Sequence, residues 1–376
     1  MKIAIEAQRI FRTKKHGMDF VALETIREIQ KIDTENQYYI LVSPGEDKCL
    51  EESPNMKIIE KKCFGGYFGW EQYALPKEIK HIKPDILHCT SNTAPIFCKT
   101  NLLLTLHDII FLEKQVHKNK SLYQKLGRLY RRLVVPIVIR RSKKIITVSS
   151  YEKNNIKDFL GLEEQKICFI YNGYSKHFVR KDNPEQVYKK YLDFDNYIFF
   201  LGNTDPKKNT ERTILAYAAY VKNTNQDNIN YLLVADLKKE IIDFIIKKNN
   251  IQWIKPYILT PNYIPNTDLP YIYSGAKAFL YTSLRESFGI PILESMACGC
   301  PIIASNTSAI PEIAGQNAIL VDPYNVSEIA LMIEKVVNND EFRKKQIQYG
   351  LERVKEFSWT KSANELLKLY KEVQNK

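Results

Sequence analysis

The sequence predicts an α/β protein made of two doubly wound, Rossmann-like domains. Short apolar runs alternate with longer amphipathic stretches, and a polar stretch at residues 175–196 separates two such series. The apolar runs are continuous rather than alternating, which indicates parallel strands that are covered on both faces. At 376 residues the chain is long enough for two domains of ordinary size. Ligands of such sheets bind at the carboxyl ends of the strands.

The expected elements follow this alternation. In the first series we expect strands at residues 2–7, 38–42, 85–88, 101–106, 144–148 and 166–170. Helices are expected at 20–32 and 122–141, the second broken near Pro136 because proline removes a helical hydrogen bond. In the second series we expect strands at 197–201, 231–235, 251–255, 278–281, 301–304 and 318–321. The predicted domains are residues 1–180 and 190–357, with a final helix at 358–376.

Composition places the chain among globular proteins, with 44% hydrophobic and 26% charged residues. No apolar run reaches the roughly 18 residues of a membrane-spanning helix. Charge interrupts the first residues too early for a secretion signal. The seven cysteines are scattered and have no metal-site spacing, which indicates reduced thiols. We therefore expect a cytoplasmic protein.

The net charge of +12 is concentrated at residues 118–144, which hold ten Lys or Arg and no Asp or Glu. Leucines recur there at helical spacing, so the segment predicts a basic amphipathic helix. One interpretation is contact with an anionic membrane surface; the other is an ordinary helix with a solvated basic face. Nucleic acid is not indicated, because no recognition motif is present. The candidate membrane-binding residues are Lys125, Arg128, Arg131 and Arg132.

The turn at residues 286–294, Glu-Ser-Phe-Gly-Ile-Pro-Ile-Leu-Glu, is the most informative segment. A buried strand is expected before it and a helix from Pro291 onward. Gly289 permits a tight turn and close approach of a ligand. The free N–H groups of the first helical turn attract anions, and Glu286 and Glu294 can accept hydrogen bonds from hydroxyl groups. A nucleotide sugar offers both phosphates and hydroxyls, so this turn indicates a nucleotide-sugar site.

A second candidate place is the loop 202–209, Gly-Asn-Thr-Asp-Pro-Lys-Lys-Asn, which follows the first strand of the second series. Lys207 and Lys208 stand just before a helix, where cations and free N–H groups together can hold a diphosphate. By itself the loop fits a solvated surface loop equally well. Its occurrence in the same domain as the 286–294 turn favours binding.

The first domain offers weaker candidates. His107 ends an expected strand and can contact a sugar hydroxyl or carry a proton, although a lone histidine is more often structural. The same holds for His88, for which a structural role is favoured. The loop at 9–18, with Gly17, either closes over phosphates or is a surface loop.

These segments, and the order in which they follow one another along the chain, resemble those of the retaining glycosyltransferases of family 4. The resemblance is strongest at residues 275–323, where 283–305 and 311–315 look like the donor-site signature of the family. The family pattern usually reads Glu-Gly-Phe-Gly, and here Ser287 replaces the first glycine. The resemblance implies the GT-B fold, with two Rossmann-like domains facing each other across a cleft and a C-terminal helix returning to the first domain. Around 105–108 and 206–209 the chain looks most like bacterial mannosyltransferases of polysaccharide assembly.

The resemblance also implies roles for the matching residues. Glu286 would contact the donor sugar, Glu294 the ribose and Lys208 the diphosphate, while His107 matches the cleft histidine. Many members have an arginine where Asn203 stands. The other implied donor contacts are Gly17, Asn203, Lys207, Ser287, Phe288, Gly289 and Ile290.

The expected function is retaining transfer of a hexose, with mannose favoured, to a glycan or lipid-linked oligosaccharide in polysaccharide or lipopolysaccharide synthesis. GDP-mannose is favoured over a UDP-hexose by resemblance only. No metal or other cofactor is expected, because no Asp-rich motif is evident. The chain would work at the inner face of the plasma membrane. The alternatives are a nucleotide-sugar epimerase or phosphorylase and a non-catalytic carbohydrate-binding protein; no Gly-x-Gly-x-x-Gly supports a dehydrogenase.

Overall fold

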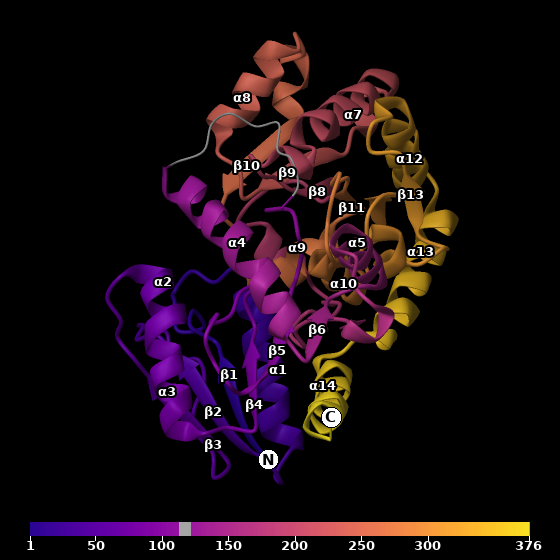
Figure 1. Cartoon of the computed structure of the whole chain (residues 1–376). Coiled ribbons are helices and arrows are strands. Elements are labelled where there is room, and N and C mark those ends of the chain that lie inside the picture. The colour runs from indigo at the N-terminus through magenta and orange to yellow at the C-terminus, as the bar shows by residue number, and fades with distance from the viewer. Residues whose placement is uncertain (113–121, 376) are drawn as a thin grey trace. The chain divides into compact units, whose positions relative to one another are not determined.

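The computed structural model describes residues 1–112 and 122–375, and of residues 122–125 the backbone only. The chain forms two compact units, Met1–Gly173 with Trp359–Lys376, and Tyr174–Ser358 (Figure 1). The first unit thus ends at Gly173, earlier than the residue 180 expected. The polar stretch 175–196 is part of the second unit because Tyr188 is buried there and its ring packs 5.3 Å from that of Tyr197.

The first unit contains a seven-stranded parallel sheet in the order β3-β2-β1-β4-β5-β6-β7. Its register pairs Ile3 with Tyr38 on one side and with Ile86 on the other. The edge strand β3 was not predicted, since its half-exposed sequence lacks a continuous apolar run. The strands are β1 (Lys2–Glu6), β2 (Gln37–Val42), β3 (Met56–Glu60), β4 (Ile86–Cys89), β5 (Asn101–Thr105), β6 (Lys144–Thr147) and β7 (Ile167–Phe169).

Helices cover both faces of this sheet. The C-terminal helix α14 packs against α1, and Tyr370 of α14 shares a buried core with Ile26 of α1. This confirms the expected return of the last helix to the first domain. The helices are α1 (Gly17–Ile32), α2 (Gly66–Gly69), the π-helical turn η1 (Trp70–Ala74), α3 (Leu75–Ile82), α4 (Leu122–Arg141), α5 (Ser150–Leu160), the short η2 (Glu164–Lys166) and α14 (Trp359–Gln374).

Helix α4 is continuous through Pro136, so the predicted break is wrong. Val134 and Val135 precede the proline, Val138 and Ile139 follow it, and all four are buried in the core of the first unit. Burial on both sides of the proline outweighs the one helical hydrogen bond that it removes.

The second unit contains a six-stranded parallel sheet in the order β10-β9-β8-β11-β12-β13. The strand expected at 251–255 is wrong, since η5 (Gln252–Tyr257) is a 3₁₀ helix anchored by the buried Ile254. The edge strand β10 begins just after it. The strands are β8 (Tyr197–Leu201), β9 (Tyr231–Ala235), β10 (Ile258–Asn262), β11 (Ala278–Tyr281), β12 (Ile302–Ser305) and β13 (Ile319–Val321).

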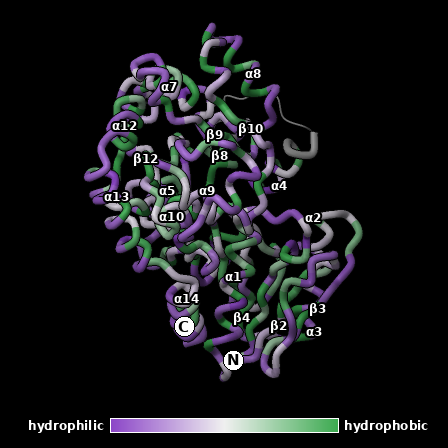
Figure 2. The backbone as a smooth tube through the Cα atoms, turned by 180° about the vertical axis from the view of Figure 1, so that it is seen from behind, coloured by the Kyte–Doolittle hydropathy of each residue, from purple (hydrophilic) through white to green (hydrophobic). Residues whose placement is uncertain are grey.

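Hydrophobic stretches follow the strands of both sheets (Figure 2). The helices of the second unit are α6 (Glu185–Tyr188), η3 (Pro206–Lys208), α7 (Thr210–Asn223), η4 (Gln226–Asn228), α8 (Lys239–Lys248), α9 (Leu269–Gly275), α10 (Ile290–Ala297), α11 (Ile310–Ala314), α12 (Val326–Asn338), α13 (Asp340–Arg353) and η6 (Val354–Glu356). Among the described residues, none of the helices combines the length and apolar character needed to span a bilayer.

Candidate functional site

The candidate site of the second unit lies where the strand order changes direction. Strands β8 and β11 are neighbours, although β9 and β10 come between them in sequence. Such a switch point leaves a crevice at the carboxyl ends of the strands, where α/β proteins bind ligands. The loops that follow the two strands meet there, since the N–H of Leu284 donates to the carbonyl of Lys207 over 2.6 Å.

An ion pair joins these two loops. Nζ of Lys208 lies 2.5 Å from Oε1 of Glu286, and the two side chains are only 27% and 12% exposed. The sequence alone placed Lys208 on one loop and Glu286 on the other; the structure brings them together. A partly buried cation is thereby held at the switch point with a carboxylate beside it.

Tyr281, the last residue of β11, contacts both members of this pair. The Lys208 ammonium lies 5.7 Å from the centre of the Tyr281 ring, a cation–π distance. Burial, together with the nearby Glu286, raises the pKa of Tyr281 well above its ordinary value. The phenol is therefore neutral and hydrogen-bonds to Glu286. Tyr281 was not among the predicted site residues, because an aromatic residue at the end of a buried strand is typical of the hydrophobic core.

Asn209 is a second residue that sequence analysis missed. It is 3% exposed and adopts a left-handed conformation with φ of 58°. Its Nδ2 donates to the carbonyl of Thr282 over 3.0 Å and to that of Pro323 over 2.8 Å. This amide ties the end of the lysine loop to the residues that follow β11 and β13. Asparagine tolerates the left-handed region better than most residues. This preference is the sequence feature that could have identified Asn209.

Glu286 is held from a third loop. Its backbone N–H donates to Oγ of Ser308 over 3.0 Å, and its carbonyl accepts from the N–H of Ala309 over 3.3 Å. Ser308 itself has a positive φ of 55°. The loop between β12 and α11 therefore fixes the position of Glu286.

The 286–294 turn forms the other side of the site. Gly289 caps α10 with φ of 107°, a conformation that other residues rarely adopt. Pro291 is the second residue of the helix rather than the first. Within the described chain, no partner is found for the N–H groups of Gly289 and Ile290. The Phe288 ring is buried 6.0 Å from that of Phe357, so Phe288 offers only its backbone.

Glu294 lies on α10, half-buried. Burial raises the pKa of its carboxyl to about 8. Glu286 and Glu294 both act electrostatically on Tyr281, which places the two carboxyl groups around one ring. No hydrogen-bond partner for the side-chain carboxyl group of Glu294 is found in the part of the chain that the structure describes, although its backbone carbonyl accepts from the N–H of Cys298 over 3.1 Å. Its carboxyl group is available to the hydroxyl groups of a ligand.

The remaining predicted residues of this unit lie on the same two loops as the pair. Lys207 forms no ion pair with an acidic residue of the described chain, and its N–H donates to Oδ1 of Asp205 over 3.1 Å. Asn203 closes its own loop, because its Oδ1 accepts from the N–H of Asp205 over 2.8 Å. Ser287 is half-buried in the turn. Lys207 and Lys208 thus supply two positive charges, one of them already paired.

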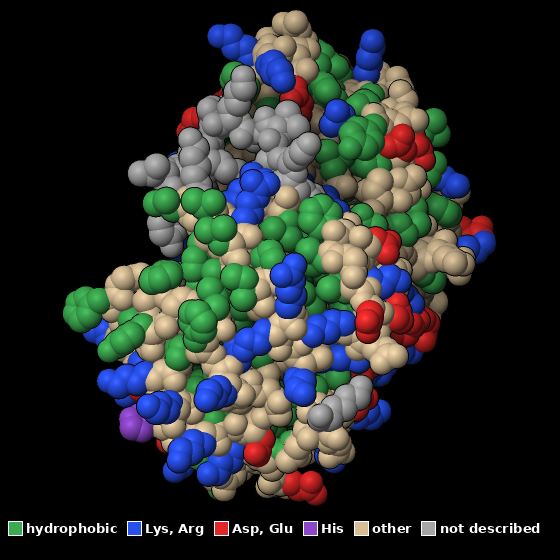
Figure 3. All heavy atoms as spheres, in the orientation of Figure 1, with side chains coloured by type: hydrophobic (Ala, Val, Ile, Leu, Met, Phe, Trp, Pro, Cys, Tyr) green, Lys and Arg blue, Asp and Glu red, His purple; other side chains and the backbone are tan. Residues whose placement is uncertain are grey.

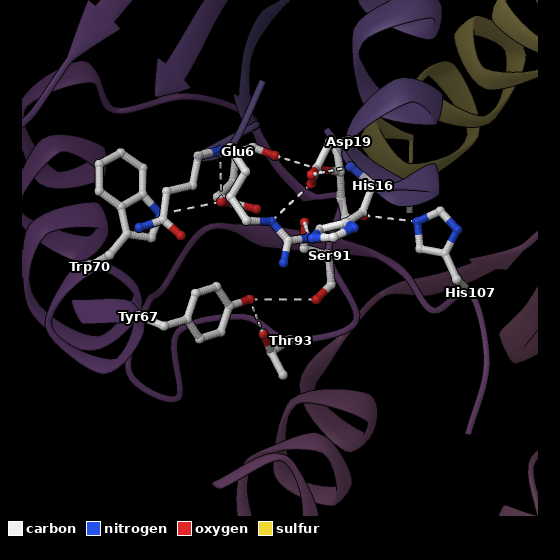
Figure 4. A network of polar contacts seen from close by, with 11 residues as sticks. Glu6, His16, Asp19, Tyr67, Trp70, Ser91, Thr93 and His107 are labelled. Atoms are coloured by element: carbon white, nitrogen blue, oxygen red, sulfur yellow. Dashed lines mark hydrogen bonds and ion pairs between the residues drawn. The ribbon is translucent and has the colours of Figure 1, made fainter. Parts of the chain in front are cut away.

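In the first unit, polar residues gather at the corresponding switch point between β1 and β4 (Figure 4). Glu6 ends β1, and its Oε1 accepts from the Trp70 indole over 3.2 Å and from the N–H of Gln8 over 3.0 Å. Burial raises the pKa of Glu6. Arg9 binds Asp19 of α1 through its Nε at 2.9 Å. This ion pair fixes the start of the loop at 9–18 against α1.

His107 is buried beside this network. Its Nε2 lies 3.0 Å from the carbonyl of Thr90, and its N–H donates to Oδ1 of Asn92 over 2.6 Å. A carbonyl only accepts, so Nε2 carries the hydrogen and Nδ1 keeps its lone pair. Burial lowers the pKa of His107, which keeps the ring neutral. His107 is therefore suited to accept a hydrogen bond from a hydroxyl group rather than to deliver a proton.

His88 and Gly17 differ in what surrounds them. Both ring nitrogens of His88 have partners, Tyr370 and Thr105, each at 2.8 Å, as expected of a structural residue. Gly17 is exposed at the start of α1, and a Cβ placed there would meet nothing within 4 Å. The fold does not require glycine at this position.

Two of the basic side chains of α4 donate hydrogen bonds to backbone carbonyl groups. Nε of Arg128 donates to the carbonyl of Phe111 over 3.0 Å, and Nη2 of Arg132 to that of Leu112 over 3.2 Å. Arg131 is half-buried. The side chain of Lys125 lies outside the described residues. Within residues 1–112 and 122–375, no three His, Cys, Asp or Glu side chains are grouped to hold a metal ion.

Comparison with known proteins assigns both units. Residues 17–177 match Glycosyltransferase Family 4, and residues 183–353 match Glycosyl transferases group 1. The O-antigen chain mannosyltransferase B of Escherichia coli is 29% identical over 238 residues, covering 61% of this chain and 61% of that protein. The O-antigen chain mannosyltransferase RfbU of Salmonella typhimurium is 26% identical over 260 residues, or 66% and 64% of the two chains. The matches thus span less than two thirds of either relative's length.

A solved structure supports the fold. HepE from Anabaena, determined in complex with UDP, superimposes with a TM-score of 0.74 over 99% of this chain and 100% of that one. At 14% identity this is a likeness of fold alone. Since the two family matches together account for most of the chain and both units have the corresponding Rossmann-like architecture, the chain belongs to the family 4 glycosyltransferases of the GT-B fold.

Proposed function

We propose that this protein transfers a hexose from a nucleotide diphosphate sugar to a glycan or lipid-linked oligosaccharide acceptor. The observation that carries the proposal is the Lys208–Glu286 pair at 2.5 Å, located at the switch point of the second sheet. The N–H groups of Gly289 and Ile290 and the carboxyl group of Glu294 adjoin it. Cation, amides and carboxyl groups match the diphosphate, sugar and ribose of such a donor.

Each residue has a chemical part in the proposed reaction. The bond between the anomeric carbon and the β-phosphate breaks, and a bond to the acceptor oxygen forms on the same face of the sugar. The acceptor proton passes to the leaving phosphate, and Lys208, with Lys207 and the helix amides, stabilises the charge that develops there. Glu286 orients the sugar hydroxyls. His107 accepts a hydrogen bond from a sugar hydroxyl, and no metal ion is required.

We propose mannose as the hexose and GDP-mannose as the donor. The support is the similarity to two O-antigen mannosyltransferases. Their names also support a place in O-antigen or lipopolysaccharide assembly. The structure of HepE was determined with UDP, so UDP-hexoses are the competing donors. In this proposal the acceptor is presented at the cytoplasmic face of a membrane.

A thermal-shift screen against GDP, UDP, GDP-mannose and UDP-hexoses tests donor choice. We expect the melting temperature to rise most with GDP and GDP-mannose. Stabilisation by UDP and UDP-glucose alone would contradict the guanine assignment but leave hexosyl transfer in place. Release of free GDP only when a glycan acceptor is present separates a transferase from an epimerase, which needs no acceptor, and from a phosphorylase, which needs phosphate.

A further inference from the structure

An exposed apolar stripe runs along helix α4. Leu126, Leu129, Leu133 and Ile137 are separated by three or four residues and therefore lie on one face of the helix. Their exposed fractions are 58%, 55%, 63% and 46%, although the opposite face of α4 is buried in the core. An ordinary surface helix buries its leucines and exposes its arginines. Helix α4 instead exposes this apolar stripe together with Arg132 and Arg140.

Exposed aromatic residues extend this stripe. Phe64 and Phe97 are 90% and 88% exposed, and Phe68 and Tyr73 are 63% and 69% exposed. Phe68 belongs to α2, and its ring lies 5.7 Å from that of Tyr130 on α4, so α2 and α4 are neighbours. Figure 3 shows hydrophobic side chains gathered over these two helices. We name these eight residues, four from α4 and four aromatic, the apolar patch.

Phe97 belongs to the same surface because its loop is fastened between η1 and α4. The N–H of Ile96 donates to Oε1 of Gln72 over 2.9 Å. Nη1 of Arg141, in the last turn of α4, donates to the carbonyl of Pro95 over 2.8 Å. The two residues that precede Phe97 are thus anchored to η1 and to the last turn of α4, and the exposed Phe97 follows them directly.

Positive charge borders the apolar patch. A hollow of about 250 Å³ beside Phe64 and Tyr73 is lined by Lys61, Lys62 and Lys77. Glu78 also lines it and is paired with Lys61 at 3.1 Å. Lys62 and Lys77 form no ion pair within the described chain. Described residues 122–141 of α4 contribute arginines but no Asp or Glu. The surface therefore combines apolar side chains that can enter a bilayer with cations that attract anionic headgroups.

We infer that the apolar patch is a docking surface for an anionic lipid membrane, in which the α4 stripe and the aromatic residues enter the acyl boundary and the lysine hollow receives a lipid phosphate. This inference rests on the proposed function and extends it, because it identifies the surface through which the protein binds the membrane that presents the acceptor. The inference shifts the contact from the arginines alone to the exposed leucines and aromatics. Arg128 and Arg132 instead hold the backbone at Phe111 and Leu112.

Vesicle flotation of the intact protein tests this inference. We expect binding to vesicles containing phosphatidylglycerol and weak binding to pure phosphatidylcholine. The double variant Phe64→Ser/Phe97→Ser and the double variant Leu126→Ser/Leu133→Ser should each lower the partition coefficient about tenfold or more. The matched control is Phe244→Ser/Leu331→Ser in the second unit, whose side chains are 65% and 59% exposed. It should bind like the unaltered protein.

A charge variant tests the lysine hollow separately. Lys62→Glu/Lys77→Glu should weaken binding to phosphatidylglycerol vesicles and leave the weak binding to phosphatidylcholine unchanged, whereas Lys239→Glu on α8 should do neither. Absence of vesicle binding, or equal binding by the serine variants and their control, would overturn the inference. So would self-association that the serine variants abolish without lipid, since the occupant would then be a second copy. Nucleotide thermal shifts report separately on donor binding, so failure there concerns the proposed function alone.

Discussion

Lys208 and Glu286 are 78 residues apart in sequence, yet Nζ of one lies 2.5 Å from Oε1 of the other. The pair occupies the point where β8 and β11 adjoin, and Tyr281 lies against both partners. A carboxylate therefore holds the lysine in place before a diphosphate arrives. A partly exposed ion pair contributes little to stability, which suits a functional rather than a structural role.

Replacing Lys208 with methionine should reduce hexosyl transfer about 10²- to 10³-fold, because one preorganised charge on the leaving diphosphate is lost. The melting temperature should change little. Steady-state kinetics and a thermal melt measure the two effects. Lys248→Met is the matched control, since it removes an exposed ion pair with Glu211 at 2.7 Å. Equal transfer rates in the two variants would refute the assignment of Lys208.

Asn209→Ala should destabilise the second unit by about 1–3 kcal/mol, because two buried carbonyls lose their donor and alanine disfavours the left-handed conformation. Asn209→Asp keeps a residue that tolerates this conformation but removes the amide donor, so it separates the two causes. Urea unfolding measures the stability, and nucleotide titration of the folded variants measures the position of Lys208. If nucleotide affinity stays normal in folded Asn209→Asp, Asn209 does not position the lysine.

Two glycine-to-alanine variants should affect different properties, one the transfer rate and the other the stability. Gly17→Ala should fold normally, because a Cβ there meets nothing within 4 Å, but it should lower transfer by blocking ligand approach. Gly289→Ala should lower stability, because φ of 107° strains alanine and its Cβ would lie 3.0 Å from Cδ1 of Ile292. Melting temperatures and transfer rates distinguish the two cases. Normal transfer by Gly17→Ala would remove Gly17 from the donor site.

Glu294 should make stability depend on pH. Its folded pKa of about 8 lies above the ordinary 4.5, so the folded protein holds a proton that the unfolded chain releases. The stability that this proton confers is complete below about pH 4.5 and is lost as the pH rises toward 8. Glu294→Gln should remove about 1–3 kcal/mol of that decline between about pH 5 and about pH 8.5. Denaturant unfolding at both values measures it; identical declines in the two proteins would contradict the raised pKa.

The site turn was predictable because its information is local. Gly289, Pro291 and the two glutamates stand within one short segment, and their residue types specify a turn, a helix start and acceptors. The doubly wound fold and the return of α14 were predictable for a similar reason, since continuous apolar strands and a strandless last helix are visible in sequence.

The parts that escaped prediction depend on contacts distant in sequence. Asn209 matters because its amide reaches Thr282 and Pro323. Helix α4 passes Pro136 unbroken because valines on both sides are buried in the core. The exposed stripe of α4 was hidden for the same reason: periodicity identifies an apolar face but not which face the core covers.

The most direct test of the central claim is a crystal structure of the protein with GDP-mannose. We expect the diphosphate within hydrogen-bonding distance of the Lys208 ammonium and of the N–H groups of Gly289 and Ile290. We also expect the ribose hydroxyls to bind Glu294 and the sugar to bind Glu286. A nucleotide bound elsewhere on the second unit, with the Lys208–Glu286 pair untouched, would contradict it.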